Sequence, residues 1–181
     1  FTYRGNISGN QVSGIESVII NQDTTPLEIV GDGIAFSGTD FVGNVENNVV
    51  TDNKGLGLAI SAFNAFTGTF AGNRAERNGL RQDGERGLGL FTRDFSGDVT
   101  NNFASNNNGT GFHFAAFGTV SGQLNNNTAN SNSGFGMTLD LRGTTTGSIS
   151  NNVANDNTSN GIRLDIARFT GSISGNTTND N

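Results

Sequence analysis

The chain of 181 residues contains no cysteine, no tryptophan and only one proline. Without cysteine, neither a disulfide nor a reactive thiol can contribute to the fold or to catalysis, and the redox compartment stays open. Charge is also sparse, because 10 Lys and Arg side chains stand against 16 Asp and Glu along the whole sequence. No basic cluster suits nucleic acid, and no apolar run is long enough to span a bilayer. We therefore expect neither nucleic-acid binding nor membrane insertion.

Hydrophobic residues are few, at 33%, whereas glycine is abundant, at 27 residues. Such a composition alone is typical of disordered chains, which bury too little apolar surface to offset the loss of chain entropy. The apolar residues nevertheless recur at fixed positions. A narrow coil needs few inward side chains per turn, so their placement favours a folded solenoid.

One sequence motif of 13 residues occurs seven times. Positions one and five are apolar, position three is Gly, position eight is Asn, and position thirteen is usually a second Asn. The copies begin at Tyr3, Phe41, Phe66, Phe95, Val120, Thr145 and Phe169. The eighth position is always Asn: Asn10, Asn48, Asn73, Asn102, Asn127, Asn152 and Asn176. The thirteenth is Asn in six copies, and the first copy has Ile15 instead: Asn53, Asn78, Asn107, Asn132, Asn157 and Asn181. This regularity predicts one supersecondary unit stacked on itself.

The spacing of the copies, mostly about 25 residues, predicts one turn of a three-strand coil per copy. We expect a first strand that carries apolar positions one and five, as in Phe95 and Val99. A middle segment should join the two Asn positions, and a third strand with alternating apolar residues should follow a glycine, as in 161–166. Asn and Gly suit the corners, and stacked Asn side chains can form ladders along the axis. No segment has the 3.6-residue period of an amphipathic helix.

These Asn ladders, Gly corners and alternating third strands resemble the right-handed parallel β-helix of pectate lyases, phage tailspikes and many secreted surface proteins. The resemblance implies an all-β fold with three sheets, about 25 residues per turn and essentially no helix. It covers residues 41–181 well and 1–40 loosely. We predict one solenoid domain over 1–181, with an irregular first repeat in 1–40 that holds surplus strand-like sequence. Phe1, Phe41, Phe66, Phe95 and Phe169 should form an aromatic stack in the lumen.

The densest charge lies between residues 74 and 94, in the longer third repeat. Most of its extra length falls between residues 78 and 87, which predicts a loop on a rigid scaffold, where binding residues often lie. The residues that could contact an acidic glycan are Arg81, Asp83, Arg86 and Arg93. Mixed charges at this density also occur in solvated surface patches whose members pair with one another, and both interpretations stay open.

Other candidate chemistry is weaker. His113 is the only histidine, and we expect it on an exposed, outward position without a proton-transfer partner. Asp140 and Asp165 lie on adjacent turns, but counting from their preceding glycines places them two positions apart. The Asn-rich ends 155–157 and 179–181 could hold calcium, although turn chemistry explains them, so we predict no cofactor or metal.

The chain begins at Phe1 rather than Met, so we expect a processed product or an excerpt. No cap is recognisable at either end, and an uncapped solenoid exposes edges that can pair. We predict an extracellular or cell-surface structural or adhesive solenoid, in a filament, sheath or giant surface protein. Its main partner would be copies of itself stacked head to tail, with surface polysaccharide as a possible ligand. The alternative is a carbohydrate-active or glycan-binding β-helix with a groove near 74–94.

Overall fold

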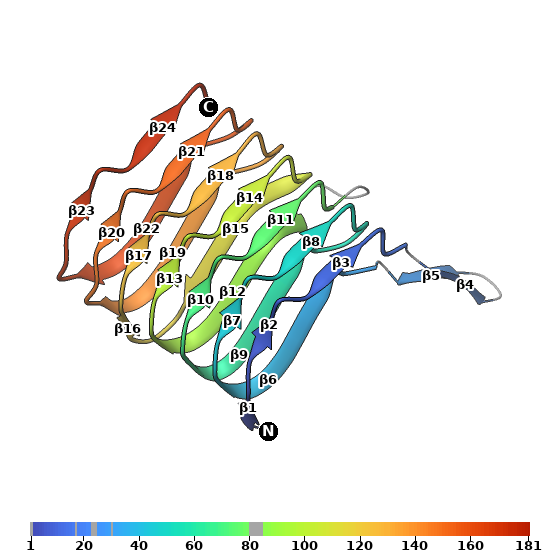
Figure 1. Ribbon diagram of the computed structural model, residues 1–181, viewed down its shortest axis with the longest axis horizontal. Coiled ribbons are helices and arrows are strands. Elements are labelled where there is room, and N and C mark those ends of the chain that lie inside the picture. The colour runs from blue at the N-terminus through green and yellow to red at the C-terminus, as the bar shows by residue number, and fades with distance from the viewer. Residues whose placement is uncertain (1, 17, 23–24, 30, 80–84) are drawn as a thin grey trace.

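The computed structural model describes residues 2–16, 18–22, 25–29, 31–79 and 85–181. These residues contain no helix. They form a parallel β-solenoid of about six turns with about 25 residues per turn and three parallel sheets. Successive turns lie side by side from the N-terminal to the C-terminal end of the coil (Figure 1). The predicted all-β, parallel β-helix architecture is confirmed.

Sheet 1 contains the long strands of the coil, all paired in parallel. The register shifts near the strand ends in three of the pairings between long strands, as between Thr92 and Asp94. The strands of sheet 1 are β1 (Thr2–Arg4), β6 (Ile34–Val42), β9 (Leu58–Thr67), β12 (Glu85–Ser96), β15 (Gly109–Ala116), β16 (Val120–Ser121), β19 (Met137–Thr145) and β22 (Ile162–Phe169).

The other two sheets are built from very short strands. Sheet 2 contains β2 (Ile7–Ser8), β7 (Val45–Glu46), β10 (Phe70–Ala71), β13 (Val99–Thr100), β17 (Leu124–Asn125), β20 (Ile149–Ser150) and β23 (Ile173–Ser174). Sheet 3 contains β3 (Gln11–Ser13), β8 (Val49–Thr51), β11 (Arg74–Glu76), β14 (Phe103–Ser105), β18 (Thr128–Asn130), β21 (Val153–Asn155) and β24 (Thr177–Asn179).

The predicted division of each turn into strands was wrong in one respect. Positions one and five do not share a strand: Phe95 is the last residue but one of the long strand β12, whereas Val99 begins β13 in sheet 2. The glycine at position three forms the corner between these sheets. A Cβ atom on Gly122 would lie 1.6 Å from the carbonyl oxygen of Gly97 on the preceding turn. Only glycine permits this close approach of backbone to backbone.

The register of sheet 1 also corrects the expected placement of Asp140 and Asp165. These two residues pair directly with each other across β19 and β22. The glycine that fixes the register is Gly136 rather than Gly134, because a Cβ on Gly136 would lie 2.5 Å from the side-chain nitrogen of Asn157. Counting from the wrong glycine moved β19 by two positions.

The interior is a narrow apolar column in which equivalent side chains of successive turns stack. Phe41 and Phe66 stack with ring centroids 4.9 Å apart, and Phe66 and Phe95 follow at 5.4 Å. Tyr3 continues this stack below Phe41 at 5.1 Å. Phe169 is not part of it, because the turns after Phe95 place Val120 and Thr145 in the same row. Phe1 lies outside the described residues.

The regular coil begins before residue 41. Strands β1, β2 and β3 pair with β6, β7 and β8. The surplus sequence forms an antiparallel hairpin of β4 (Val18–Gln22) and β5 (Thr25–Ile29), which pair with each other rather than with the coil. The hairpin extends away from the N-terminal end of the coil (Figure 1).

Candidate functional site

The 13 asparagines of the repeat line the two corners on either side of sheet 3, and nearly all of them are buried or half-buried. Beyond the first member of each ladder, the side-chain oxygen accepts two hydrogen bonds from the Asn of the preceding turn. The Oδ1 atom of Asn127, for example, accepts from Nδ2 of Asn102 at 2.9 Å and from the backbone nitrogen of Asn102 at 3.1 Å. Nδ2 of Asn127 donates in turn to Asn152 at 3.0 Å and to the carbonyl of Val99 at 2.9 Å.

The first ladder runs through Asn10, Asn48, Asn73, Asn102, Asn127, Asn152 and Asn176. The second runs through Asn53, Asn78, Asn107, Asn132, Asn157 and Asn181. At its N-terminal end the backbone nitrogen of Ile15 donates to Oδ1 of Asn53 at 3.0 Å. Every hydrogen bond between two ladder side chains is donated toward the next turn, so both ladders have a direction. Their role in the coil is structural.

The residue before each ladder Asn adopts a positive φ. The predicted motif places no restriction on this position. Before the first ladder the residues are Gly9, Asn47, Gly72, Asn101, Asn126, Asn151 and Gly175. This position holds Gly or Asn in all seven copies, and these are the residues that tolerate the left-handed conformation. That restriction is visible in the sequence and identifies the corner.

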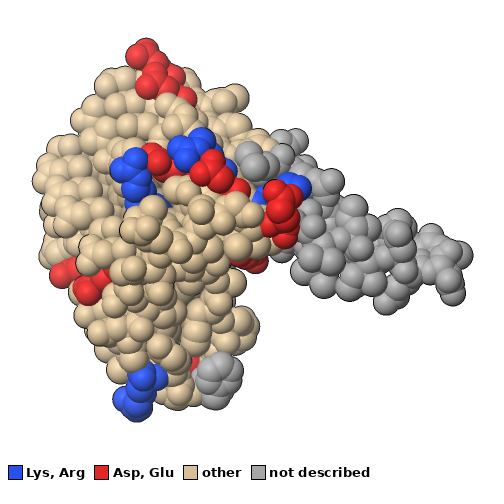
Figure 2. All heavy atoms as spheres, turned by 45° about the vertical axis from the view of Figure 1, so that its right-hand side comes forward, with Lys and Arg blue, Asp and Glu red and all other residues tan. Residues whose placement is uncertain are grey.

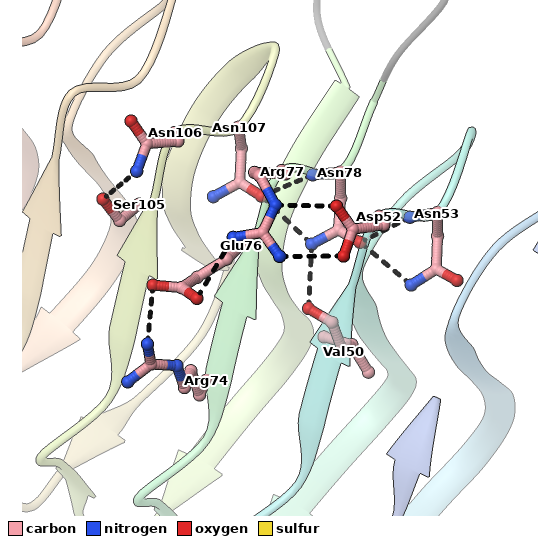
Figure 3. A network of polar contacts seen from close by, with 10 residues as sticks. All are labelled: Val50, Asp52, Asn53, Arg74, Glu76, Arg77, Asn78, Ser105, Asn106 and Asn107. Carbon is pink, nitrogen blue, oxygen red and sulfur yellow. Dashed lines mark hydrogen bonds and ion pairs between the residues drawn. The ribbon is translucent and has the colours of Figure 1, made fainter. Parts of the chain in front are cut away.

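The charged segment 74–94 divides into residues 74–77 and the residues of strand β12. In the first part the charges pair with neighbouring charges (Figure 3). Nε and Nη2 of Arg77 donate to the two carboxylate oxygens of Asp52 at 2.7 and 2.8 Å, and Arg74 contacts Glu76 at 2.9 Å. The hydrogen bonds from Arg77 lower the pKa of Asp52. Charges of both signs adjoin on the surface as well (Figure 2). This part is therefore a self-paired surface patch.

Two of the four predicted glycan-contact residues, Arg86 and Arg93, belong to the described part of the chain. Arg81 and Asp83 lie outside the described residues. Arg86 and Arg93 both lie on strand β12, near its opposite ends. Arg93 is mostly exposed and lies 3.8 Å from Asp94, whereas Arg86 is half-buried and contacts His113.

His113 is the centre of a polar chain across the outer face of sheet 1, contrary to the expectation that it lacks partners. Nε of Arg86 donates to Nδ1 of His113 at 2.9 Å, and Nε2 of His113 lies 3.0 Å from Oδ2 of Asp140. Because Nδ1 accepts from Arg86, the neutral imidazole carries its proton on Nε2 and donates it to Asp140. Both ring nitrogens are therefore occupied.

Electrostatics keep this imidazole neutral. Burial lowers the pKa of His113, and the nearby charge of Arg86 lowers it further, while the hydrogen bond to Asp140 acts in the opposite direction. Burial likewise lowers the pKa of Arg86. Phe91 completes the surroundings, since its ring meets the imidazole edge-on at 5.2 Å and the Arg86 guanidinium lies 5.0 Å above it.

General acid–base chemistry at His113 would require one of these hydrogen bonds to break. The imidazole has no nitrogen available to a substrate, and geometry within hydrogen-bond reach is the first requirement of such a catalyst. Asp140 is held by His113, and the adjacent Asp165 is held by Arg142 at 2.9 Å. The two carboxylates therefore each have a cationic or donor partner rather than facing an open site. Residues 86, 113 and 140 are spaced 27 apart, which is one turn plus three positions for the first step and one turn plus two for the second. This spacing is the sequence signal for the three-residue polar network.

An apolar depression of about 200 Å³ adjoins the polar chain. It is lined by Ser61, Phe63, Phe91, Thr92 and Phe117. Phe63 is 69% exposed and Phe117 is 65% exposed, so two large aromatic side chains face water beside it. No motif in the sequence distinguishes these residues.

Among the described residues, no group of three or more His, Asp or Glu side chains is placed to hold a metal ion. The same residues include no helix that is long and apolar enough to cross a membrane. Comparisons of the chain with protein-family models, curated proteins and solved structures found no match.

Proposed function

We propose that this protein is a structural, adhesive β-solenoid of the cell surface or extracellular space, and that copies of it stack head to tail. The observation that carries the proposal is the direction of the first Asn ladder. At the N-terminal face, Oδ1 of Asn10 accepts no hydrogen bond from any described residue. At the C-terminal face, the backbone nitrogen of Asn176 has no acceptor among the described residues. Oδ1 of Asn10 on the N-terminal face of one copy can therefore accept the hydrogen bond that the backbone nitrogen of Asn176 on the C-terminal face of another copy donates.

The apolar column supports the same contact. Ile149 is buried in the row of sheet 2, but Ile173, the next residue of that row, is 51% exposed. Leu164 is 38% exposed in the last turn, although its neighbour Leu139 is buried. Covering these two side chains would contribute on the order of 1–3 kcal/mol per junction. A contact between two different faces does not close on itself and extends into a fibre.

Electron microscopy of the purified chain tests the proposal. We expect unbranched fibres in which each copy advances by several turns of about 4.8 Å. Ile173→Lys places a charge on the C-terminal face and should abolish the fibres, because a buried, unpaired charge is costly. Ser174→Lys is the matched control, since this adjacent side chain is exposed and belongs to an outward position. A wild-type chain that stays monomeric at high concentration would rule out stacking.

A further inference from the structure

The irregularity in sheet 1 arranges outward side chains in one line along the coil. The inward residues Ala62, Thr92, Ala116 and Leu141 pair across successive long strands. The residue that follows each of them is exposed, and together these residues form an axial stripe: Phe63, Arg93, Phe117 and Arg142. Aromatic and basic side chains therefore alternate. Each kind recurs every second turn, about 9.5 Å apart at the usual strand spacing.

The two aromatic members of the axial stripe flank the apolar depression. Phe63, Phe91 and Phe117 supply three rings around it, and Ser61 contributes a hydroxyl at the edge. Neighbouring aromatic side chains that are exposed together and rimmed by polar residues are typical of binding grooves. The depression is small, at about 200 Å³, and partly open to solvent, so it suits one flat ring with a weakly polar face.

The two basic members can exchange their partners at little cost. Arg93 lies 3.8 Å from Asp94, and Arg142 lies 2.9 Å from Asp165, and both arginines are more than half exposed. Exposed ion pairs contribute little to stability and are screened by salt. A guanidinium that is accessible in this way can form paired hydrogen bonds with a carboxylate of a ligand.

We propose that the axial stripe binds an acidic polysaccharide laid along the coil. The apolar faces of alternate sugar rings would lie on Phe63 and Phe117, while carboxylates would meet Arg93 and Arg142. A linear polymer with a repeating unit matches a surface whose aromatic and basic groups repeat at a fixed axial interval. The site is a binding site without turnover, and it is distinct from the end faces used for stacking.

Isothermal titration calorimetry with oligogalacturonate and alginate oligomers tests this proposal, with cello-oligosaccharides of equal length as neutral probes. We expect binding of an acidic oligomer to the wild-type chain. The double variant Phe63→Ala with Phe117→Ala should bind at least about tenfold more weakly, as expected for central aromatic contacts. Arg93→Gln with Arg142→Gln should weaken binding and reduce its salt dependence.

The matched control is Arg74→Gln, because Arg74 lies 5.0 Å above the ring of Phe103 on sheet 3, away from the axial stripe. This variant should bind like the wild type. Repeating the titration with the Ile173→Lys variant distinguishes oligomer binding from stacking. This variant should bind the acidic oligomer with the affinity of the wild type. The proposal is overturned if no acidic oligomer binds, if cello-oligosaccharides bind equally well, if Arg74→Gln loses as much affinity, or if the phenylalanine variants alter self-association instead of binding.

Discussion

At the scale of single residues, the ladder asparagines solve a problem that a coil with tight corners creates. Each corner leaves backbone groups that no strand pairs, and buried polar groups without partners are costly. Asn127 is 1% exposed and uses both amide hydrogens and its oxygen in hydrogen bonds to three other residues. Its side chain therefore connects three turns of the coil.

Asn127→Ala should lower the free energy of unfolding by about 1–3 kcal/mol or more, because it leaves buried partners on Asn102 and Val99 unpaired. Asn160→Ala is the matched control: Asn160 is exposed, and its side chain forms no hydrogen bond with another described residue. That variant should stay within about 0.5 kcal/mol of the wild type. Urea unfolding measures both, and equal losses would contradict the ladder.

The stacked corner glycines lead to a second prediction. Gly122→Ala introduces a Cβ 1.6 Å from the Gly97 carbonyl, so the two turns must separate. We expect a loss of about 2 kcal/mol or more, or a chain that fails to fold. Gly14 also has a positive φ but has open space around its Cβ position. Gly14→Ala should therefore lose only about 1 kcal/mol, the strain of the left-handed conformation. Similar unfolding midpoints for both variants would argue against the close approach.

The polar chain through His113 predicts how stability depends on pH. The pKa of His113 is lowered in the folded protein relative to its ordinary value of 6.5. As the pH falls below 6.5, the unfolded chain therefore binds a proton before the folded chain does, and stability decreases until the folded pKa is passed. Above 6.5 this contribution is fully present. Thermal unfolding of the wild type should show this decline, and His113→Gln should lack it. Identical pH profiles would mean that the imidazole is not held neutral.

At the scale of strands and corners, the sequence predicted the sheets and the length of each turn, but not the contacts between side chains on the surface. The two Asn positions and the apolar positions identified three sheets and the turn length, because each depends on a residue type that repeats at every turn. Strand boundaries were harder to predict. Sheet 1 continues through the position-one residue, and its register shifts where different turns hold one or two extra residues, as with Phe63 and Asn64 opposite Arg93.

The surface could not be read from the repeat because it depends on the exact register. A two-residue error separated Asp140 from Asp165 in the sequence analysis and hid the partners of His113. The glycine four residues after the second Asn, as in Asn107 and Gly111 or Asn132 and Gly136, would have corrected this error. The axial stripe does not follow the 25-residue motif, because successive turns alternate Phe and Arg at its position.

The β4–β5 hairpin is the one described element outside the coil. Within the described part of the chain, its two strands pair with each other and with no strand of the coil, and β1 covers just Asp40–Val42 of β6. Deleting residues 18–29 should therefore leave the coil folded, as measured by circular dichroism. In a stack, the hairpin of one copy lies toward the next copy, where strand addition could extend the long sheet. Light scattering of the variant that lacks residues 18–29 should therefore show slower fibre growth than the wild type, or none. Normal fibre growth of this variant would exclude the hairpin from the junction.

At the scale of the whole molecule, the two end faces can be blocked separately. Ile7 begins the apolar row of sheet 2 and Ile173 ends it, so the two side chains would meet across a stacked junction. Ile7→Lys blocks the N-terminal face and Ile173→Lys blocks the C-terminal face. Each variant alone should stay monomeric while remaining folded, because every possible junction then buries an unpaired charge.

Mixing the two variants is the most direct test of head-to-tail stacking. The unmodified C-terminal face of the Ile7→Lys chain can still meet the unmodified N-terminal face of the Ile173→Lys chain. Sedimentation velocity of an equimolar mixture should therefore show dimers that contain one copy of each variant and nothing larger. A mixture of folded chains that remains monomeric, or either variant forming fibres alone, would contradict the account.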